Sequence, residues 1–143
     1  MKILKCKPMF LLLVSVLFTL PAVGIADIAM IAGTDSTLAS VAKNDVKLVY
    51  LGKRSKISGV KVIPVSLPDD DATTQAFLKT VVSKTAKQYK AYWARIVFTG
   101  KGAPPPQLNS AEDLKAWVTK NPGAIGFIDS KDVTDTVKVI GTF

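Results

Sequence analysis

The length of chain that is available to form a folded core depends on how the first 26 residues are interpreted. Three lysines precede an apolar run at Met9–Leu20, Pro21 ends that run, and the small residues Gly24 and Ala26 follow. This order of basic, apolar and small residues is typical of a secretory signal peptide. We therefore expect cleavage after Ala26 and export to the periplasm. An N-terminal anchor that is not cleaved is the alternative.

Removal of residues 1–26 would leave 117 residues, 27–143, which is enough for one domain with a modest core. The single cysteine, Cys6, lies in the removed part, and the whole chain contains no histidine. An exported domain without disulfides has to be held together by its core. We expect no metal, no cofactor, no catalytic residues and no enzymatic activity, because zinc or haem ligation and Cys- or His-based catalysis lack their usual side chains.

The charge of residues 27–143 is mildly basic, with 16 Lys and Arg against 11 Asp and Glu, a net charge of +5. No five like charges occur in a row, so we expect no nucleic-acid partner. The cluster formed by Lys53, Arg54 and Lys56 fits either a solvated loop or an anionic partner. The Met9–Leu20 run is too short for a helix that spans a bilayer, so we expect no membrane span after cleavage.

The apolar pattern along residues 27–143 predicts four strands and four helices. Apolar and β-branched runs indicate strands, and apolar residues at helical spacing indicate helices. The strands are expected at 27–33, 60–65, 124–129 and 136–143, and the helices within 41–53, 71–82, 85–100 and 110–121. Pro64 places the second strand at a sheet edge or near a strand end. The order β-α-β-α-α-α-β-β implies an α/β domain with a mixed β-sheet flanked by about four helices.

The aromatic residues of the last two helices are predicted to pack in the core. Tyr89 and Trp93 share one stripe of the third helix, and Trp117 stands beside Leu114 in the fourth. A stacking platform built from Tyr92, Trp93 and Trp117 is the alternative, since exposed aromatic faces bind planar ligands.

Five stretches of this chain follow one another in a specific order. They are LGKR at 51–54, IPV at 63–65, YWARIVFTGKGAPP at 92–105, NPGAIGFI at 121–128 and VKVI at 137–140. This pattern resembles the phosphate-binding-protein-like family, which comprises the periplasmic solute-binding components of phosphate ABC transporters and their short single-domain relatives. The resemblance covers nearly all of residues 27–143. It implies a single periplasmic-binding-protein-like lobe, roughly half of a two-lobed transport component.

The resemblance also implies where an anion would bind. In the long relatives, a Ser-Gly-Thr-Thr turn opens a helix and holds phosphate with its hydroxyls and backbone N–H groups. The matching positions here are Asp71, Ala72, Thr73 and Thr74, so both threonines are retained. Asp71 puts a carboxylate where the anion is expected, and this carboxylate can itself accept hydrogen bonds from the helix N–H groups.

A second candidate oxyanion site is the turn that contains Thr34, Ser36 and Thr37, after the first expected strand. Free N–H groups at a helix N-terminus attract anions, and open α/β sheets place ligands at strand-to-helix turns. The alternative for both turns is ordinary turn and cap chemistry, which uses the same residue types.

Together these observations favour a non-enzymatic periplasmic solute-binding-like protein that holds phosphate or another small oxyanion weakly, in connection with phosphate ABC transport. The alternative is an envelope protein-interaction or regulatory module that has lost anion binding. Its partner would be an envelope transporter, a porin or a sensor protein.

Overall fold

The centre of the sheet is β1 (Ile28–Gly33), in the computed structural model that describes residues 27–143 of the chain. The first five residues of β1 are buried, as expected for a continuous apolar run with both faces covered. Antiparallel neighbours flank it, β5 (Ala124–Asp129) on one side and β6 (Val137–Thr142) on the other. The predicted signal peptide lies outside the described residues, so its cleavage stays a prediction.

The sheet is mixed, because β4 (Ile63–Pro64) runs parallel to β5 while the other two pairs are antiparallel. The strand order is β4-β5-β1-β6, which puts Pro64 in an edge strand as predicted. The predicted strand 60–65 is divided at Val62, because Val60–Lys61 forms β3 and turns back on β2 (Lys56–Ile57).

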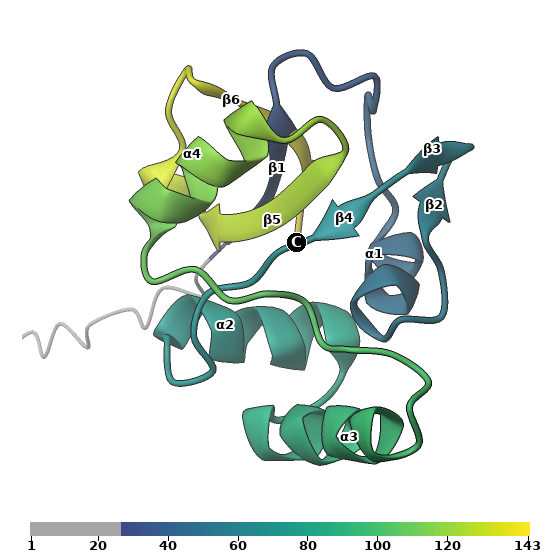
Figure 1. The fold of residues 1–143 in the computed structure, drawn as a ribbon. Coiled ribbons are helices and arrows are strands. Elements are labelled where there is room, and N and C mark those ends of the chain that lie inside the picture. The colour runs from purple at the N-terminus through teal and green to yellow at the C-terminus, as the bar shows by residue number, and fades with distance from the viewer. Residues whose placement is uncertain (1–26) are drawn as a thin grey trace, which may run out of the picture.

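The β2–β3 hairpin is not among the predicted strands. Ser58 and Gly59 both have positive φ angles, +50° and +81°. Two such residues between short strands are what a tight hairpin turn requires. The hairpin forms an arm at the side of the sheet (Figure 1).

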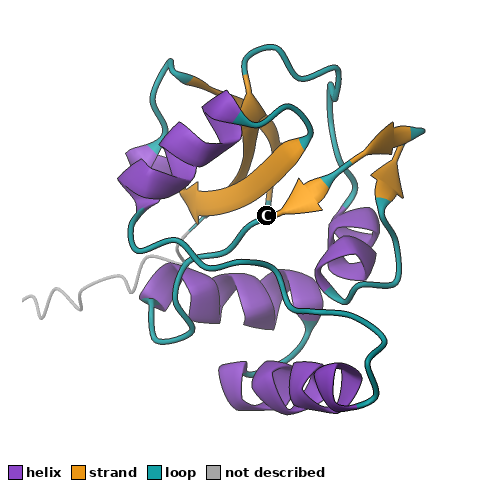
Figure 2. Cartoon of the chain, viewed as in Figure 1, coloured by secondary structure: helices purple, strands orange, loops and turns teal. Residues whose placement is uncertain are grey.

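Helices cover both faces of the sheet (Figure 2). The adjacent strand residues Gly126 and Phe127 point to opposite faces. Gly126 lies against Leu114 of α4 (Ala111–Lys120), whereas the Phe127 ring stacks on Phe77 of α2 (Ala72–Phe77) with 4.0 Å between ring centroids. The fold class predicted from the sequence, a mixed sheet flanked by four helices, is therefore confirmed.

Of the remaining helices, one lies beside the end of the second helix and the other lies beneath that helix in Figure 1. The second helix continues beyond α2 as a π-helical turn, η1 (Leu78–Val82), which packs on α1 (Lys43–Tyr50). α3 (Ala86–Phe98) is the outermost element on this side of the molecule (Figure 1). None of the helices within residues 27–143 is long and apolar enough to cross a membrane.

One aromatic assignment was wrong. Trp93 is buried, with 6% of its surface exposed, but Trp117 is 39% exposed. The buried stripe of α4 is formed instead by Leu114, Lys115 and Val118. The Lys115 ammonium is accommodated there because it donates to the carbonyl of Asp132 and pairs with Glu112, at 3.1 and 2.7 Å.

Two buried tyrosine hydroxyls tie α1 to the sheet and to α3. Tyr50 donates to the carbonyl of Val65 (2.8 Å), and Tyr89 donates to the carbonyl of Tyr50 (2.7 Å). Burial raises the pKa of Tyr50, and the neighbouring Tyr89 raises it further. Burial also raises the pKa of Tyr89. The Trp93 indole opposes part of that rise, although its N–H makes no hydrogen bond of ordinary geometry.

We expect these tyrosines to make the fold sensitive to alkali. In the unfolded chain they ionise near pH 10, but in the folded protein only at higher pH. Their contribution to stability is therefore complete below about pH 10 and is lost as the pH rises above it. The melting temperature should fall between about pH 9 and pH 11, and it should fall less steeply in Tyr89→Phe. Identical alkaline profiles for the two proteins would contradict this assignment.

Candidate functional site

The N-terminus of α2 is closed by a side chain of the chain itself. Asp71 is the N-cap residue, and its Oδ1 atom accepts hydrogen bonds from the backbone N–H of Thr73 at 2.8 Å and of Thr74 at 3.3 Å. The prediction that Asp71 caps this helix is confirmed. The two N–H groups that the resemblance assigns to an anion are thus already paired with a carboxylate.

The two threonines differ in what they could offer a ligand. Thr73 is half-buried, whereas Thr74 is 2% exposed and its Oγ1 makes no hydrogen bond among the described residues. Only Thr73 can present its hydroxyl to solvent without a rearrangement. An anion at this turn would therefore have to displace the Asp71 carboxylate and then rely on the two N–H groups and the Thr73 hydroxyl.

The candidate turn at Thr34–Thr37 does not open a helix. An extended segment follows it, and α1 begins only at Lys43, after an Ala42 cap whose side chain makes no hydrogen bond. The Ser36 hydroxyl accepts a hydrogen bond from Leu38 N at 3.3 Å. The expectation of a helix N-terminus at this turn was therefore wrong, and local turn chemistry accounts for Ser36.

The first turn does border a cavity of about 360 Å³. Asp35, Ser36 and Thr37 line one side, and Lys61 of the β2–β3 hairpin and Thr119 of α4 line the other. Thr34 is not part of this lining. Lys61 is a cation that sequence spacing could not associate with this turn, because the hairpin brings it there from a distant part of the chain.

The two candidate turns do not form one site. In Figure 1 the segment after β1 runs over the top of the view, whereas the N-terminus of α2 lies at the lower left. The two turns also do not share this cavity. Residues of the first turn line it, whereas Asp71, Thr73 and Thr74 do not. Each turn has to be judged as a ligand site by itself.

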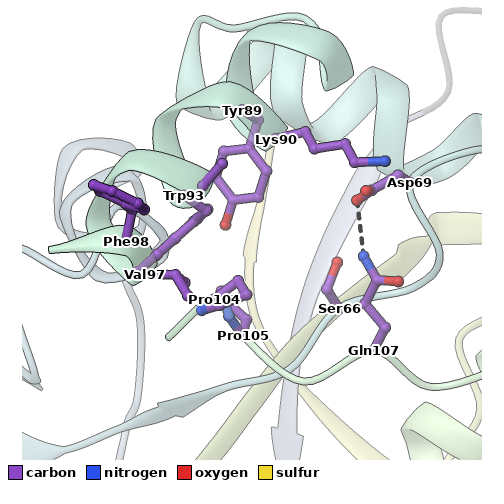
Figure 3. Close-up of a pocket in the computed structure, with 11 residues that line it drawn as sticks. Ser66, Asp69, Tyr89, Lys90, Trp93, Val97, Phe98, Pro104, Pro105 and Gln107 are labelled. Atoms are coloured by element: carbon purple, nitrogen blue, oxygen red, sulfur yellow. Dashed lines mark hydrogen bonds between the residues drawn. The ribbon is translucent and has the colours of Figure 1, made fainter. Parts of the chain in front are cut away.

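A cavity of about 610 Å³ lies between α3 and the proline segment 104–106. Tyr89, Trp93 and Val97 form its α3 wall, and Phe98, which is 92% exposed, stands at its rim (Figure 3). Pro104 and Pro105 form the opposite wall. Both walls could be recognised in the sequence, one as the apolar stripe of the third expected helix and the other as the run of prolines. Nothing in the sequence showed that these two segments face each other.

Polar groups gather at one end of this cavity. Gln107 Nε2 donates to Asp69 Oδ1 at 2.8 Å, and the Lys90 side chain extends toward the same carboxylate without forming an ion pair (Figure 3). Backbone hydrogen bonds from Ser66 N to Pro106 O and from Leu108 N to Ser66 O fix the proline segment beside this end. The cavity is thus an apolar hollow with a polar mouth, a form that small-molecule and side-chain pockets share.

Comparison with known proteins identifies the fold. No protein-family model matches the chain, and no curated protein sequence matches it. Solved structures do resemble it, among them two crystal structures that each match 81% of this chain. One is a protein from Clostridium perfringens assigned as a phosphate ABC transporter substrate-binding protein, with bound phosphate (TM-score 0.61, 22% identity). The other is an ABC-type phosphate transport receptor from Vibrio cholerae (TM-score 0.59, 19% identity).

The chain therefore has a phosphate-binding-protein-like fold, as the sequence motifs predicted. It spans less than half of each of these proteins, 45% of the first and 47% of the second. At this level of identity the likeness establishes the fold, and binding has to be argued from the residues of this chain.

Proposed function

We propose that this protein is a non-enzymatic, periplasmic solute-binding-like protein that holds phosphate or another small oxyanion only weakly, in connection with phosphate ABC transport. The observation that carries this proposal is the cap at α2. Asp71 already occupies the N–H groups of Thr73 and Thr74, which an anion would otherwise use. A phosphate that binds there has to replace a carboxylate of like charge.

The repulsion between the Asp71 carboxylate and phosphate sets the expected affinity for phosphate. Two like charges about 4 Å apart repel by roughly 4 kcal/mol at an effective dielectric constant of about 20. Phosphate affinities of a few micromolar correspond to about 7–8 kcal/mol of binding free energy. A loss of a few kcal/mol from that value gives a dissociation constant no tighter than about 0.1 mM.

Two observations support the non-enzymatic part of the proposal. The solved structures that share the fold are a substrate-binding protein and a transport receptor. Residues 27–143 also contain neither cysteine nor histidine, so this part of the sequence supplies neither an imidazole base nor a thiol nucleophile.

Calorimetric titration with inorganic phosphate tests the proposal. The natural chain should give heat that saturates only at about 0.1 mM phosphate or above. Thr73→Ala should weaken this binding further, because Thr73 supplies the accessible hydroxyl. Ser36→Ala is the matched control and should leave binding unchanged. Tight binding that is insensitive to Thr73→Ala would reject the α2 turn, and a selective loss in Ser36→Ala would move the site to the first turn.

The second candidate function is an envelope interaction or regulatory module that has lost anion binding. The cavity of about 610 Å³ favours it, because aromatic and proline walls can receive an apolar side chain of a transporter, porin or sensor protein. Absence of phosphate heat at millimolar concentration, both in the natural chain and in Asp71→Ser, would favour this second function over the first.

A further inference from the structure

The positive charge of the described chain is concentrated in one segment. Residues 72–111 contain six basic residues and no acidic one: Lys79, Lys84, Lys87, Lys90, Arg95 and Lys101. The other described residues contain ten basic and eleven acidic side chains, so their charges nearly cancel. The excess positive charge is therefore carried by η1, α3 and the loop after α3, which form the lower part of the molecule in Figure 1.

α3 turns a distinct face away from the protein. Tyr89 and Trp93 are buried on its inner side. Lys87, Ala91, Ala94 and Phe98 follow one another at intervals of four, three and four residues, which places them along a single opposite stripe. All four are exposed. We call this stripe, together with the flanking exposed residues Lys90 and Arg95, the outer face of α3.

The outer face ends in an unusually exposed aromatic residue. Phe98, the last residue of α3, is 92% exposed, and its neighbour Val97 is 51% exposed. The other large apolar side chains that are exposed reach only 39–44%. Lys87, Lys90 and Arg95 take part in none of the ion pairs formed among residues 27–143. An aromatic side chain thus projects into solvent from a face whose cations form no ion pair among the described residues, although Lys90 extends toward Asp69 (Figure 3).

We propose that the outer face of α3 binds an anionic lipid surface. The two alanines in the middle of the stripe let the helix lie close to a flat surface. The long lysine and arginine side chains can extend sideways to lipid phosphates. Phe98 can then enter the apolar boundary beneath the headgroups, as aromatic residues of surface-bound helices do.

The shape of the face favours a bilayer over an acidic protein. A protein partner is recognised through matched recesses and hydrogen bonds. The centre of this stripe offers only the methyl groups of Ala91 and Ala94, and of these two only Ala94 also borders the cavity of about 610 Å³. A bilayer requires a high density of positive charge and an apolar side chain at the surface, and the outer face supplies both. This inference is independent of whether the α2 turn binds phosphate.

Vesicle sedimentation tests this inference on the chain that begins at Asp27, since residues 27–143 contain the strands, the helices and the buried core that the structure describes. The protein should sediment with vesicles made of equal parts of phosphatidylglycerol and phosphatidylcholine, but not with pure phosphatidylcholine vesicles. Binding should fall steeply when NaCl is raised from about 0.05 M to about 0.5 M, because salt screens the attraction.

Two variants locate the contact. Combining Lys87→Glu, Lys90→Glu and Arg95→Glu should lower the apparent affinity for the anionic vesicles by more than about tenfold. Phe98→Ser should lower it by about tenfold through the loss of an inserted ring. These side chains are exposed, so both variants should keep the melting temperature of the natural chain.

Matched control variants test whether binding depends on the outer face itself or only on the protein's net charge and exposed apolar side chains. Combining Lys53→Glu, Lys56→Glu and Lys61→Glu makes the same change in net charge in the β2–β3 hairpin and the turn before it, and Val139→Ser removes an exposed apolar side chain from β6. Both controls should retain binding to within about twofold.

Equal losses in the two charge variants, equal binding to neutral vesicles, or no binding to anionic vesicles would each overturn the inference. Binding to soluble polyglutamate without binding to vesicles would overturn it too, and would assign the face to an acidic protein.

Discussion

Replacing Trp93 with alanine should lower the free energy of unfolding by about 3–5 kcal/mol. The Trp93 ring is 6% exposed and packs edge-on against Tyr89 and Tyr92, with centroid distances of 6.4 and 5.6 Å. It also covers Gly52, at which a Cβ atom would come within 2.7 Å of the indole. A domain of this size has only about 5–15 kcal/mol of stability in total. Urea denaturation followed by far-ultraviolet circular dichroism measures the loss, and the variant should melt far below the natural chain.

Trp117→Ala is the control for this prediction. The Trp117 ring is 39% exposed on α4, so its removal leaves no closed cavity. We expect a loss of less than about 1 kcal/mol. Equal losses in the two variants, or a larger loss for Trp117, would show that α3 is not held to the protein by the Trp93 ring.

Replacing Asp71 with serine should strengthen phosphate binding at the α2 turn by at least about tenfold. The change removes a negative charge that lies 2.8 Å from the N–H of Thr73, and it leaves a hydroxyl that can donate to an anion. It should also cost up to about 1 kcal/mol of stability, because serine replaces a capping carboxylate. Calorimetric titration measures the first effect, and thermal melting measures the second.

Asp70→Ser is the control that distinguishes the effect of the Asp71 cap on phosphate affinity from the effect of the segment's net charge. Asp70 is the exposed neighbour of Asp71, and its side chain caps none of the N–H groups of α2. If the Asp71 carboxylate acts by occupying the site, Asp70→Ser should improve phosphate affinity by less than about threefold. A similar gain in both variants would mean that the net charge of the segment, and not the cap, controls binding.

The features that depend on neighbouring residues could be predicted from the sequence. Asp71 and Ser110 cap their helices because a short polar side chain reaches the N–H groups two or three residues ahead. Gly52 and Gly100 follow helices with φ angles of +67° and +68°, which glycine adopts without strain. β1 could be predicted in the same way, because it is a continuous run of apolar residues along the chain.

The features that depend on contacts between distant segments could not be predicted. Trp117 stands within one turn of Leu114, so the helical pattern alone could not decide which of Lys115 and Trp117 faces the sheet. The buried Lys115 is accommodated because its ammonium donates a hydrogen bond to the Asp132 carbonyl, from the segment after β5, and pairs with Glu112. The large cavity likewise depends on how the proline segment pairs with Ser66.

The candidate sites were only partly predictable for the same reason. The residue types at Thr34–Thr37 fit both an anion turn and an ordinary turn, and the start of α1 at Lys43 decides against a helix N-terminus there. The basic outer face of α3 was missed, because the lysines are separated along the sequence and gather only on the folded helix. A search for consecutive like charges along the sequence does not detect such a face.

The backbone amide signals of Thr73 and Thr74 give the most direct test of the claim that Asp71 closes the anion site at α2. Nuclear magnetic resonance can follow both N–H groups while inorganic phosphate is added to the natural chain and to Asp71→Ser. Both signals should stay in place in the natural chain up to about 0.1 mM phosphate, and they should shift together in Asp71→Ser. Shifts of both amides in the natural chain at micromolar phosphate would contradict it.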